Sequence, residues 1–532
     1  MPKWLRDAVF YEIYPQSFYD ANGDGIGDFE GIIQKLDYVK GLGCNALWLN
    51  PCFDSPFKDA GYDVRNYLLA APRYGSNDDL ERLFAEAHRR DLRVILDLVP
   101  GHTSEEHGWF KASARPEPNE FSGRYIWTSH CFEGAEGIGF IGGEFPRNGT
   151  YLINFFKCQP ALNYGFHEIR RPWQHPVDHP DCAATREAMK DVMRFWLDRG
   201  CDGFRVDMAA SLVKYDDENK TGTSSIWKNV RAMLDREYPE AALVAEWSDP
   251  PRSLKAGFHA DFLLNNPGSG YRRLLRDYDQ SLGTPSLEQG DGSFFRKDRQ
   301  GDITAFLDDY LPAYGQTRHD GFISIITGNH DTVRLRFNHT PEELKLAFAV
   351  IFTLPGVPFL YYGDEIAMRY LDIPSKEGGY FRTGARTPMQ WGRGKNLGFS
   401  AADPSALYLP VDGAADAPTV ESEEKDPASL LNTLRAILRF RQSRDELHAD
   451  PNLEVLYAEK RRLPFVYQRG KLVMAVNPSG QKQSAPVKAG DGRRLFAVTA
   501  DGAAGAPAGP SPGSLTGGVC TVEGQSFTVF ET

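Results

Sequence analysis

The sequence has no long uninterrupted apolar run and no excess of basic residues. Residues 1–7 lack the hydrophobic core of a signal peptide, and no later segment reaches the length of a membrane span. Lysine and arginine number 60 against 72 aspartates and glutamates, so the net charge is −12, which argues against a nucleic-acid partner. These absences predict a cytoplasmic protein whose partner is a neutral or cationic small molecule, without a membrane or nucleic acid.

Cysteine is scarce as well. The 532 residues contain 7 cysteines, an odd number without a Cys-x-x-Cys pair, which is typical of reduced thiols and argues against disulfides or zinc. No tandem repeat is evident, so a repeat architecture is excluded. The chain must therefore fold around ordinary hydrophobic cores, as one large domain with appendages or as a few packed domains.

Short apolar segments typical of buried parallel strands recur along the chain, with amphipathic helical patterns between them. The segments are 9–14, 46–49, 94–99, 204–206, 243–245, 262–264, 322–326 and 358–361. Eight such strands are the number that closes a TIM barrel, (β/α)₈. The pattern therefore predicts an α/β fold of this kind.

The spacing of the strands also predicts two appendages. Residues 102–163, after the third strand, are rich in glycine, proline and aromatics without helical period, which indicates an inserted subdomain. Short alternating strands over 451–532 indicate a C-terminal antiparallel β-sandwich domain. The catalytic barrel would then comprise residues 1–101 and 164–450.

Three acidic side chains follow predicted strands. Alternation along 204–206 points Arg205 and Asp207 toward the inside of the barrel, while Glu246 and Asp331 follow later strands. Because barrel enzymes carry their chemistry at the C-terminal ends of strands, we expect these acids to converge. An ordinary salt bridge is the alternative for Arg205 and Asp207 taken alone.

A convergence of carboxylates suits a reaction in which positive charge develops. Arg205 would keep Asp207 ionised, as a nucleophile requires, and Trp247 would exclude water from Glu246, as a general acid requires. The oxocarbenium-like transition state of glycoside cleavage supplies the positive charge. His102 and His330 could donate to sugar hydroxyls at the same rim, or could be structural hydrogen-bonding residues.

A loop near the N-terminus alternates oxygen-bearing residues in the manner of a calcium-binding loop. The oxygen donors would be Asp20, Asn22, Asp24, the Ile26 carbonyl and Asp28. A solvated acidic turn would show the same pattern. We predict a structural Ca²⁺ or Mg²⁺ here and no cofactor for catalysis.

At these residues the sequence resembles the α-amylase family of glycoside hydrolases, in its oligo-1,6-glucosidase and α-glucosidase branch. The resemblance extends from residue 8 to at least Trp391. It implies that Asp207 forms the glycosyl-enzyme, that Glu246 acts as acid and base, and that Asp331 stabilises the transition state. It also supports a structural metal ion at the loop of residues 20–28.

The resemblance further implies how the terminal glucose is held. The side chains that it assigns to sugar binding are Asp59, Tyr62, His102, Arg205, His330, Arg382 and Arg386. Tyr62 would stack beneath the ring, while the two late arginines and Asp59 would clamp the sugar and close the groove. The implied activity is that of a retaining, exo-acting α-glucoside hydrolase, which acts on short α-linked gluco-oligosaccharides by double displacement.

The match breaks at four positions. Gly101 stands where the family usually has Asn, Ala161 and Thr383 where Asp is usual, and Met208 where the branch has Val or Ala. Linkage preference and oligomeric state therefore stay open. Two alternatives also remain: a transglucosidase or isomerase of the same family, such as a trehalose synthase or a sucrose-acting enzyme, and a non-catalytic sugar-binding relative.

Overall fold

Eight strands form the central sheet of the computed structural model, which describes residues 1–280, 285–298, 301–377, 381–505 and 512–532. The strands are β1 (Phe10–Ile13), β2 (Ala46–Leu49), β5 (Arg93–Leu98), β8 (Gly203–Val206), β9 (Ala242–Ala245), β10 (Ala260–Leu263), β11 (Phe322–Ile325) and β12 (Phe359–Tyr361). Their order is β11-β10-β9-β8-β5-β2-β1-β12, and a parallel bridge between Ile326 and Phe359 joins the two end strands. The predicted (β/α)₈ TIM barrel is confirmed.

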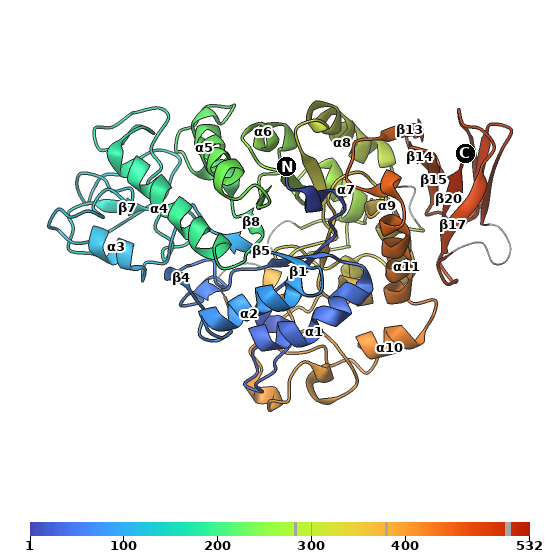
Figure 1. The fold of residues 1–532 in the computed structure, drawn as a ribbon, viewed down its shortest axis with the longest axis horizontal. Helices are drawn as coiled ribbons and strands as arrows, with labels where there is room; N and C mark the ends of the chain where they lie inside the picture. The colour runs from blue at the N-terminus through green and yellow to red at the C-terminus, as the bar shows by residue number, and fades with distance from the viewer. Residues whose placement is uncertain (281–284, 299–300, 378–380, 506–511) are drawn as a thin grey trace. The chain divides into compact units, whose positions relative to one another are not determined.

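Helices alternate with these strands along the chain (Figure 1). They are α1 (Phe29–Leu42), α2 (Asn77–His88), α4 (Pro180–Leu197), α5 (Thr221–Glu237), α6 (Pro250–Lys255), α7 (Gly270–Leu275), α8 (Ile303–Thr317), α9 (Pro341–Ile351), α10 (Val420–Lys425) and α11 (Leu430–Gln442). Capping side chains determine where several begin: Asp28 accepts the Gly31 N–H at α1, and His179 accepts the Asp181 N–H at α4. Within the described part of the chain, no helix is both long and apolar enough to cross a bilayer.

The segment between β5 and α4 has small elements of its own, as the predicted insertion requires. It contains α3 (Gly108–Ser113) and the antiparallel pair β6 (Phe140–Gly142) and β7 (Thr150–Leu152); a second small pair, β3 (Phe53–Asp54) and β4 (Asn66–Ala70), lies earlier in the chain. Within the segment between β5 and α4, a buried hydrophobic cluster is formed by Ile126, Leu152, Ala161 and Phe166. The helix α3 was not predicted, because six residues are too few to show a helical period.

The C-terminal part folds as two antiparallel sheets. Its strands are β13 (Leu453–Tyr457), β14 (Phe465–Arg469), β15 (Leu472–Asn477), β16 (Gln483–Pro486), β17 (Arg493–Thr499), β18 (Gly513–Thr516), β19 (Val519–Val522) and β20 (Ser526–Glu531). The five-stranded sheet runs β13-β14-β15-β20-β17 and the three-stranded sheet β16-β19-β18. Val473, Leu515 and Phe530 belong to one buried cluster that both sheets supply, as expected of a β-sandwich.

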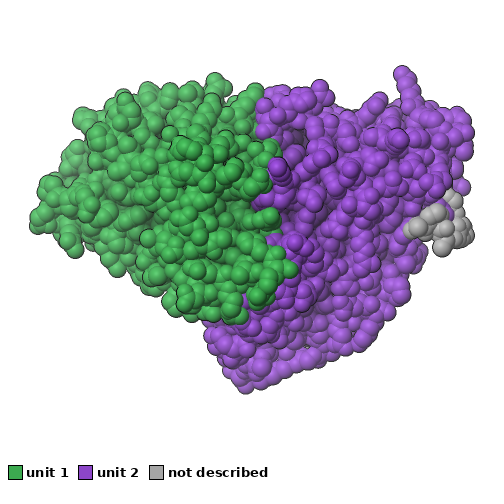
Figure 2. Space-filling view, viewed as in Figure 1, with its two compact units in different colours: residues 1–2, 48–89, 93–262 green, residues 3–47, 90–92, 263–532 purple. Residues whose placement is uncertain are grey.

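The chain divides into two compact units (Figure 2). Unit 1 comprises residues 1–2, 48–89 and 93–262, and unit 2 comprises residues 3–47, 90–92 and 263–532. These units do not follow the boundaries 1–101 with 164–450, 102–163 and 451–532, so that three-domain division stays a prediction.

Candidate active site

The predicted site residues fall into two groups, one in each unit. In unit 1, the guanidinium of Arg205 on β8 contacts three carboxylates. Its Nη1 donates to Asp97 Oδ1 at 2.7 Å and to Asp207 Oδ1 at 3.2 Å, and its Nη2 lies 2.8 Å from Glu246 Oε2. The Arg205 side chain is 1% exposed. Two of the predicted catalytic acids therefore share one buried cation.

Strand register explains this convergence. Asp97 on β5 pairs with Arg205 on β8, so the two side chains point to the same face of the sheet. Asp207 lies two residues beyond Arg205 and shares that face, while Glu246 directly follows β9. The alternation that predicted an inward pair of Arg205 and Asp207 is thus present in unit 1.

The surroundings of Asp207 disfavour its ionised form. Burial and the neighbouring Glu246 raise the pKa of Asp207 well above its usual range, and Arg205 opposes this shift. The sequence expectation that Arg205 keeps Asp207 ionised is thus opposed, because burial and a second acid outweigh the one guanidinium. A retaining glycosidase needs an ionised nucleophile beside a protonated acid, so positive charge on the substrate would have to lower this pKa again.

Asp97 is a third acid at Arg205 to which the sequence reasoning gave no role. Burial raises the pKa of Asp97 to about 6, against the lowering effect of Arg205. Its Oδ2 accepts hydrogen bonds from Tyr62 Oη at 2.9 Å and Trp48 Nε1 at 3.2 Å. Tyr62 is 4% exposed, so its hydroxyl fixes Asp97 while its ring is the surface predicted to stack under a sugar.

A chain of polar contacts determines the tautomer of His102. Lys214 Nζ can only donate, and it lies 3.1 Å from Asn154 Oδ1, so the Asn154 amide nitrogen must face His102 Nδ1, at 3.2 Å. His102 therefore carries its hydrogen on Nε2 and donates it to the Tyr62 carbonyl at 3.1 Å. Burial lowers the pKa of His102 to about 3, which keeps the ring neutral. A sugar hydroxyl would compete with Tyr62 for this hydrogen.

Gly101 makes room for this chain. A Cβ at residue 101 would lie 2.8 Å from Asn154 Nδ2. The amide that contacts His102 thus comes from the inserted segment, beside the position where the family usually has Asn. Glycine at position 101, where the family usually has Asn, therefore leaves room for the Asn154 amide.

We expect Gly101→Asn to lower the free energy of unfolding by about 1–3 kcal/mol through overpacking, and to lower activity by displacing Asn154. Adding Asn154→Ala should recover part of the lost stability, which denaturant unfolding of the single and double variants measures as a coupling energy. Gly108→Asn is the control, because nothing lies within 4 Å of a Cβ there. Strictly additive effects of the two substitutions would contradict this packing.

Asp261 on β10 is a functional candidate that the sequence reasoning missed. Its fully buried carboxylate accepts the backbone N–H groups of Trp247, Ser248 and Asp249 at 2.9–3.1 Å, and the Ser253 hydroxyl at 2.8 Å. It thereby holds the turn that directly follows Glu246. A lone aspartate beside an apolar segment was the available signal, but the predicted strand 262–264 left it out, whereas the observed strand is Ala260–Leu263.

In unit 2, Asp331 is surrounded by cations. Arg382 Nη1 and Arg386 Nη2 lie 3.0 and 2.8 Å from Asp331 Oδ1, and His330 Nε2 lies 3.3 Å from Oδ2. Burial alone would raise the pKa of Asp331, but His330 and the two arginines hold it well below the usual range. The Asp331 side chain is still 38% exposed, so an ionised carboxylate stays accessible.

Two buried glutamates hold these cations in place. His330 Nδ1 lies 2.9 Å from Glu12 Oε1, so a carboxylate faces each ring nitrogen. Arg386 Nη1 lies 3.3 Å from Glu377 Oε2, which also accepts the Tyr14 hydroxyl at 2.9 Å. Asp59, which belongs to unit 1, accepts a hydrogen bond from Gln159 at 2.7 Å. The clamp that joins Asp59 to the two arginines stays a prediction.

The predicted metal loop precedes α1 and is folded around its own N–H groups. Asp20 accepts from Gly23 and Gly25, each at 2.7 Å, and Asp28 accepts from Ala21, Asn22 and Gly31. Asn22 and Asp24 accept from residues 24 and 26. Oxygen-only donors suit Ca²⁺ or Mg²⁺, yet among the described residues these carboxylates do not form a group with oxygens within 4.8 Å of one another. A structural cation at this loop stays a prediction.

We expect Ca²⁺ to raise the melting temperature of chelator-treated protein, and the shift to vanish in Asp24→Ala, because the metal would bind only the folded loop. Thermal denaturation with and without Ca²⁺ measures this. Asp320→Ala removes an exposed aspartate elsewhere and should keep the shift. If Ca²⁺ does not change the melting temperature of the unaltered chain, the predicted metal site is wrong.

A family model matches most of the chain. It describes the catalytic domain of alpha amylase and matches residues 12–261 and 297–450. The chain belongs to the alpha-amylase family. The matched segments of this family member include Asp207, Glu246 and Asp331.

Individual family members show how this chain is related. The trehalose synthase/amylase TreS of Mycolicibacterium smegmatis is 35% identical over 83% of this chain and 77% of its own length. A probable alpha-glucosidase of Rhizobium meliloti is 31% identical over 90% of this chain and 88% of its own. The crystal structure of XgtA, an alpha-glucosyl transfer enzyme, matches with a TM-score of 0.77 and 25% identity, over 100% of this chain and 99% of that one.

Proposed function

We propose that this protein is a retaining enzyme that acts on α-glucosides by double displacement and passes the glucosyl group mainly to a sugar acceptor. The observation that carries the proposal is the single buried guanidinium of Arg205 in contact with both Asp207 and Glu246. This contact brings the two acids that would act as nucleophile and general acid to one guanidinium.

In the first step Asp207 attacks the anomeric carbon. The bond from this carbon to the leaving oxygen breaks, and Glu246 gives its proton to that oxygen. Positive charge develops on the sugar as the bond breaks, and the carboxylates around Arg205 stabilise it. The products are a glucosyl ester on Asp207 and a free alcohol.

In the second step Glu246, now ionised, takes a proton from an acceptor hydroxyl. The acceptor oxygen attacks the anomeric carbon and Asp207 leaves as a carboxylate, so the configuration is retained. Water as the acceptor gives hydrolysis, and a sugar hydroxyl gives transfer or isomerisation. The two outcomes use the same catalytic groups.

Asp331 has the role of transition-state stabiliser in this proposal. Its ionised, partly exposed carboxylate can accept ring hydroxyls as the sugar flattens, and Arg382, Arg386 and His330 keep it charged. The remaining sugar contacts are those expected from the sequence: Asp59, Tyr62, His102 and Arg205.

Transfer is favoured over hydrolysis by the relatives. The sequence reasoning put exo-hydrolysis first and kept a transglucosidase or isomerase as the alternative. TreS, which is named a trehalose synthase/amylase, is 35% identical, whereas the probable alpha-glucosidase is 31% identical. XgtA, which is named for glucosyl transfer, matches at 25% identity over nearly its whole length. The non-catalytic alternative is disfavoured, because Asp207, Glu246 and Asp331 are all present and each contacts a charged partner within its own unit.

The catalytic assignment predicts that Asp207→Asn and Glu246→Gln each lower kcat by ~10³-fold or more with the fold intact. Kinetics on 4-nitrophenyl α-glucoside, with circular dichroism as a check of the fold, measures this. Asp191→Asn, on the exposed side of α4, is the matched control and should keep full activity. If either active-site variant keeps the kcat of the unaltered chain, the catalytic role assigned to that residue is wrong.

Azide separates the two roles. With Glu246→Ala, azide should intercept the glucosyl-enzyme and give a glucosyl azide of retained configuration. With Asp207→Ala it should attack the substrate directly and give the inverted product. The opposite pairing of variant and configuration would exchange the two assignments.

The proposed preference for a sugar acceptor predicts the products. Incubation with maltose, trehalose, sucrose and isomaltose should convert at least one of them mainly into an isomer with little free monosaccharide, or into a longer sugar with one leaving monosaccharide for each glucosyl group transferred. Chromatography of the products over time measures the ratio. Free glucose as the dominant product from every sugar would instead establish the hydrolase.

A further inference from the structure

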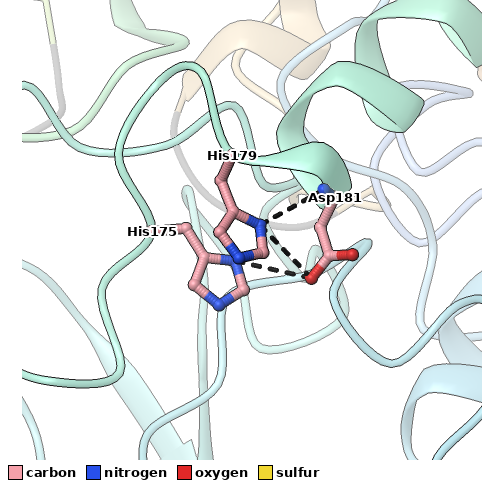
Figure 3. A group of neighbouring side chains, drawn as sticks. All are labelled: His175, His179 and Asp181. Carbon is pink, nitrogen blue, oxygen red and sulfur yellow. Dashed lines mark hydrogen bonds and ion pairs between the residues drawn. The ribbon is translucent and has the colours of Figure 1, made fainter.

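His175, His179 and Asp181 form a side-chain cluster in unit 1 that belongs to neither group of the candidate active site. The three residues lie in the loop before α4 and in its first turn (Figure 3). The Nδ1 atoms of His175 and His179 are each 3.6 Å from Asp181 Oδ2. We propose that these three side chains bind a divalent transition-metal ion of the Zn²⁺, Co²⁺ or Ni²⁺ class.

The spacing of the three atoms suits an ion better than it suits their own hydrogen bonds. At 3.6 Å the nitrogens lie beyond hydrogen-bond range of the carboxylate oxygen. Two ligands of a tetrahedral Zn²⁺, with bonds of about 2.0–2.2 Å, are about 3.4 Å apart. Among the described residues this is the one group of three or more His, Cys, Asp or Glu whose ligand atoms all lie within 4.8 Å of one another.

Nδ1 of each imidazole carries a lone pair, which accepts a hydrogen bond from a neighbouring N–H. The Asp181 N–H can only donate, and it lies 3.2 Å from His179 Nδ1, so that nitrogen carries a lone pair. Asn163 Oδ1 accepts from the Gly165 N–H, which turns its amide nitrogen toward His175 Nδ1, also at 3.2 Å. An ion at this position would replace both donors, one of which is the Asp181 N–H that His179 caps, so its coordination bonds must outweigh the loss of that cap.

The backbone around the cluster is built to hold the carboxylate. A Cβ at Gly123 would lie 1.8 Å from Asp181 Oδ2, so only glycine leaves room for this side chain. The His175 carbonyl accepts the Phe166 N–H at 2.8 Å, and the Pro176 carbonyl accepts the His179 N–H at 3.0 Å. The backbone positions of His175 and His179 are therefore fixed by hydrogen bonds, while their side chains can still turn.

The cluster opens to solvent and to a cavity. The side chains of His175, His179 and Asp181 are 29, 34 and 41% exposed, which leaves coordination positions for water. His175 and Asp181 also line a cavity of about 250 Å³. The two rings are nearly parallel, with centroids 3.7 Å apart, so one ring must turn about its Cβ–Cγ bond to share an ion, and its exposure permits this.

The ligand set determines the class of ion and its effect. Two imidazoles and one carboxylate favour Zn²⁺, Co²⁺ or Ni²⁺ over Ca²⁺ and Mg²⁺, which take oxygen ligands. A bound ion would tie the loop of residues 163–179 to the start of α4 and stabilise the folded chain by mass action. It would be a structural site, separate from the oxygen-lined loop of residues 20–28.

Titration calorimetry and thermal denaturation of the untagged, chelator-treated full chain with ZnCl₂ test the proposal. One Zn²⁺ should bind per chain and raise the melting temperature, and Co²⁺ should give the visible absorption bands of a protein-bound ion. Excess Ca²⁺ should leave Zn²⁺ binding unchanged. A chain that binds no Zn²⁺ overturns the proposal.

Three variants locate the ion. His175→Ala and Asp181→Asn should each weaken Zn²⁺ binding by about tenfold or more, because one of three ligands is lost. Gly123→Ala should also weaken it, although it alters no ligand, because it displaces Asp181. His319→Ala, Gly108→Ala and Asp24→Ala should bind as the unaltered chain does. Equal affinity in His175→Ala and His319→Ala would place the ion elsewhere and refute the site, even if one of the other variants failed to fold.

Discussion

The burial of one guanidinium among three carboxylates is the constraint on which the candidate active site depends. A charge removed from water must be paired, and breaking a buried pair costs several kcal/mol. Arg205 meets this requirement with Asp97, Asp207 and Glu246, which come from three neighbouring strands. Since one cation faces three acids, the negative charge around Arg205 is in excess, which suits a bound group that carries positive charge.

Unit 2 presents the opposite ratio of charges. One acid, Asp331, faces two arginines and a histidine, and these cations are in turn held by Glu12 and Glu377. An acid so surrounded keeps its charge and its orientation. The two carboxylate environments therefore suit different tasks: exchange of a proton at Asp207 and Glu246, and a fixed negative charge at Asp331.

The fold and the inward pair on β8 could be predicted from local patterns. Apolar strand segments, strand alternation and acids at strand ends all repeat over a few residues. Asp97, Asp261 and Asn154 could not be assigned a role in this way, because their partners lie 108, 14 and 52 residues away and are reached through strand register or through a loop whose path has no periodic signal. The balance between water and sugar as acceptor also depends on groups that exclude water, and no pattern marks these.

The cavity left by the missing side chain at Gly101 is filled from the inserted segment by Asn154. Two positions that are 53 residues apart in the chain thus compete for one volume. An evolutionary path to the more usual Asn at 101 must first shorten residue 154, since the reverse order passes through an overpacked intermediate. Positions 101 and 154 should accordingly co-vary among members of the family, and the residue that orients His102 would then come from the loop after β5 instead of from the inserted segment.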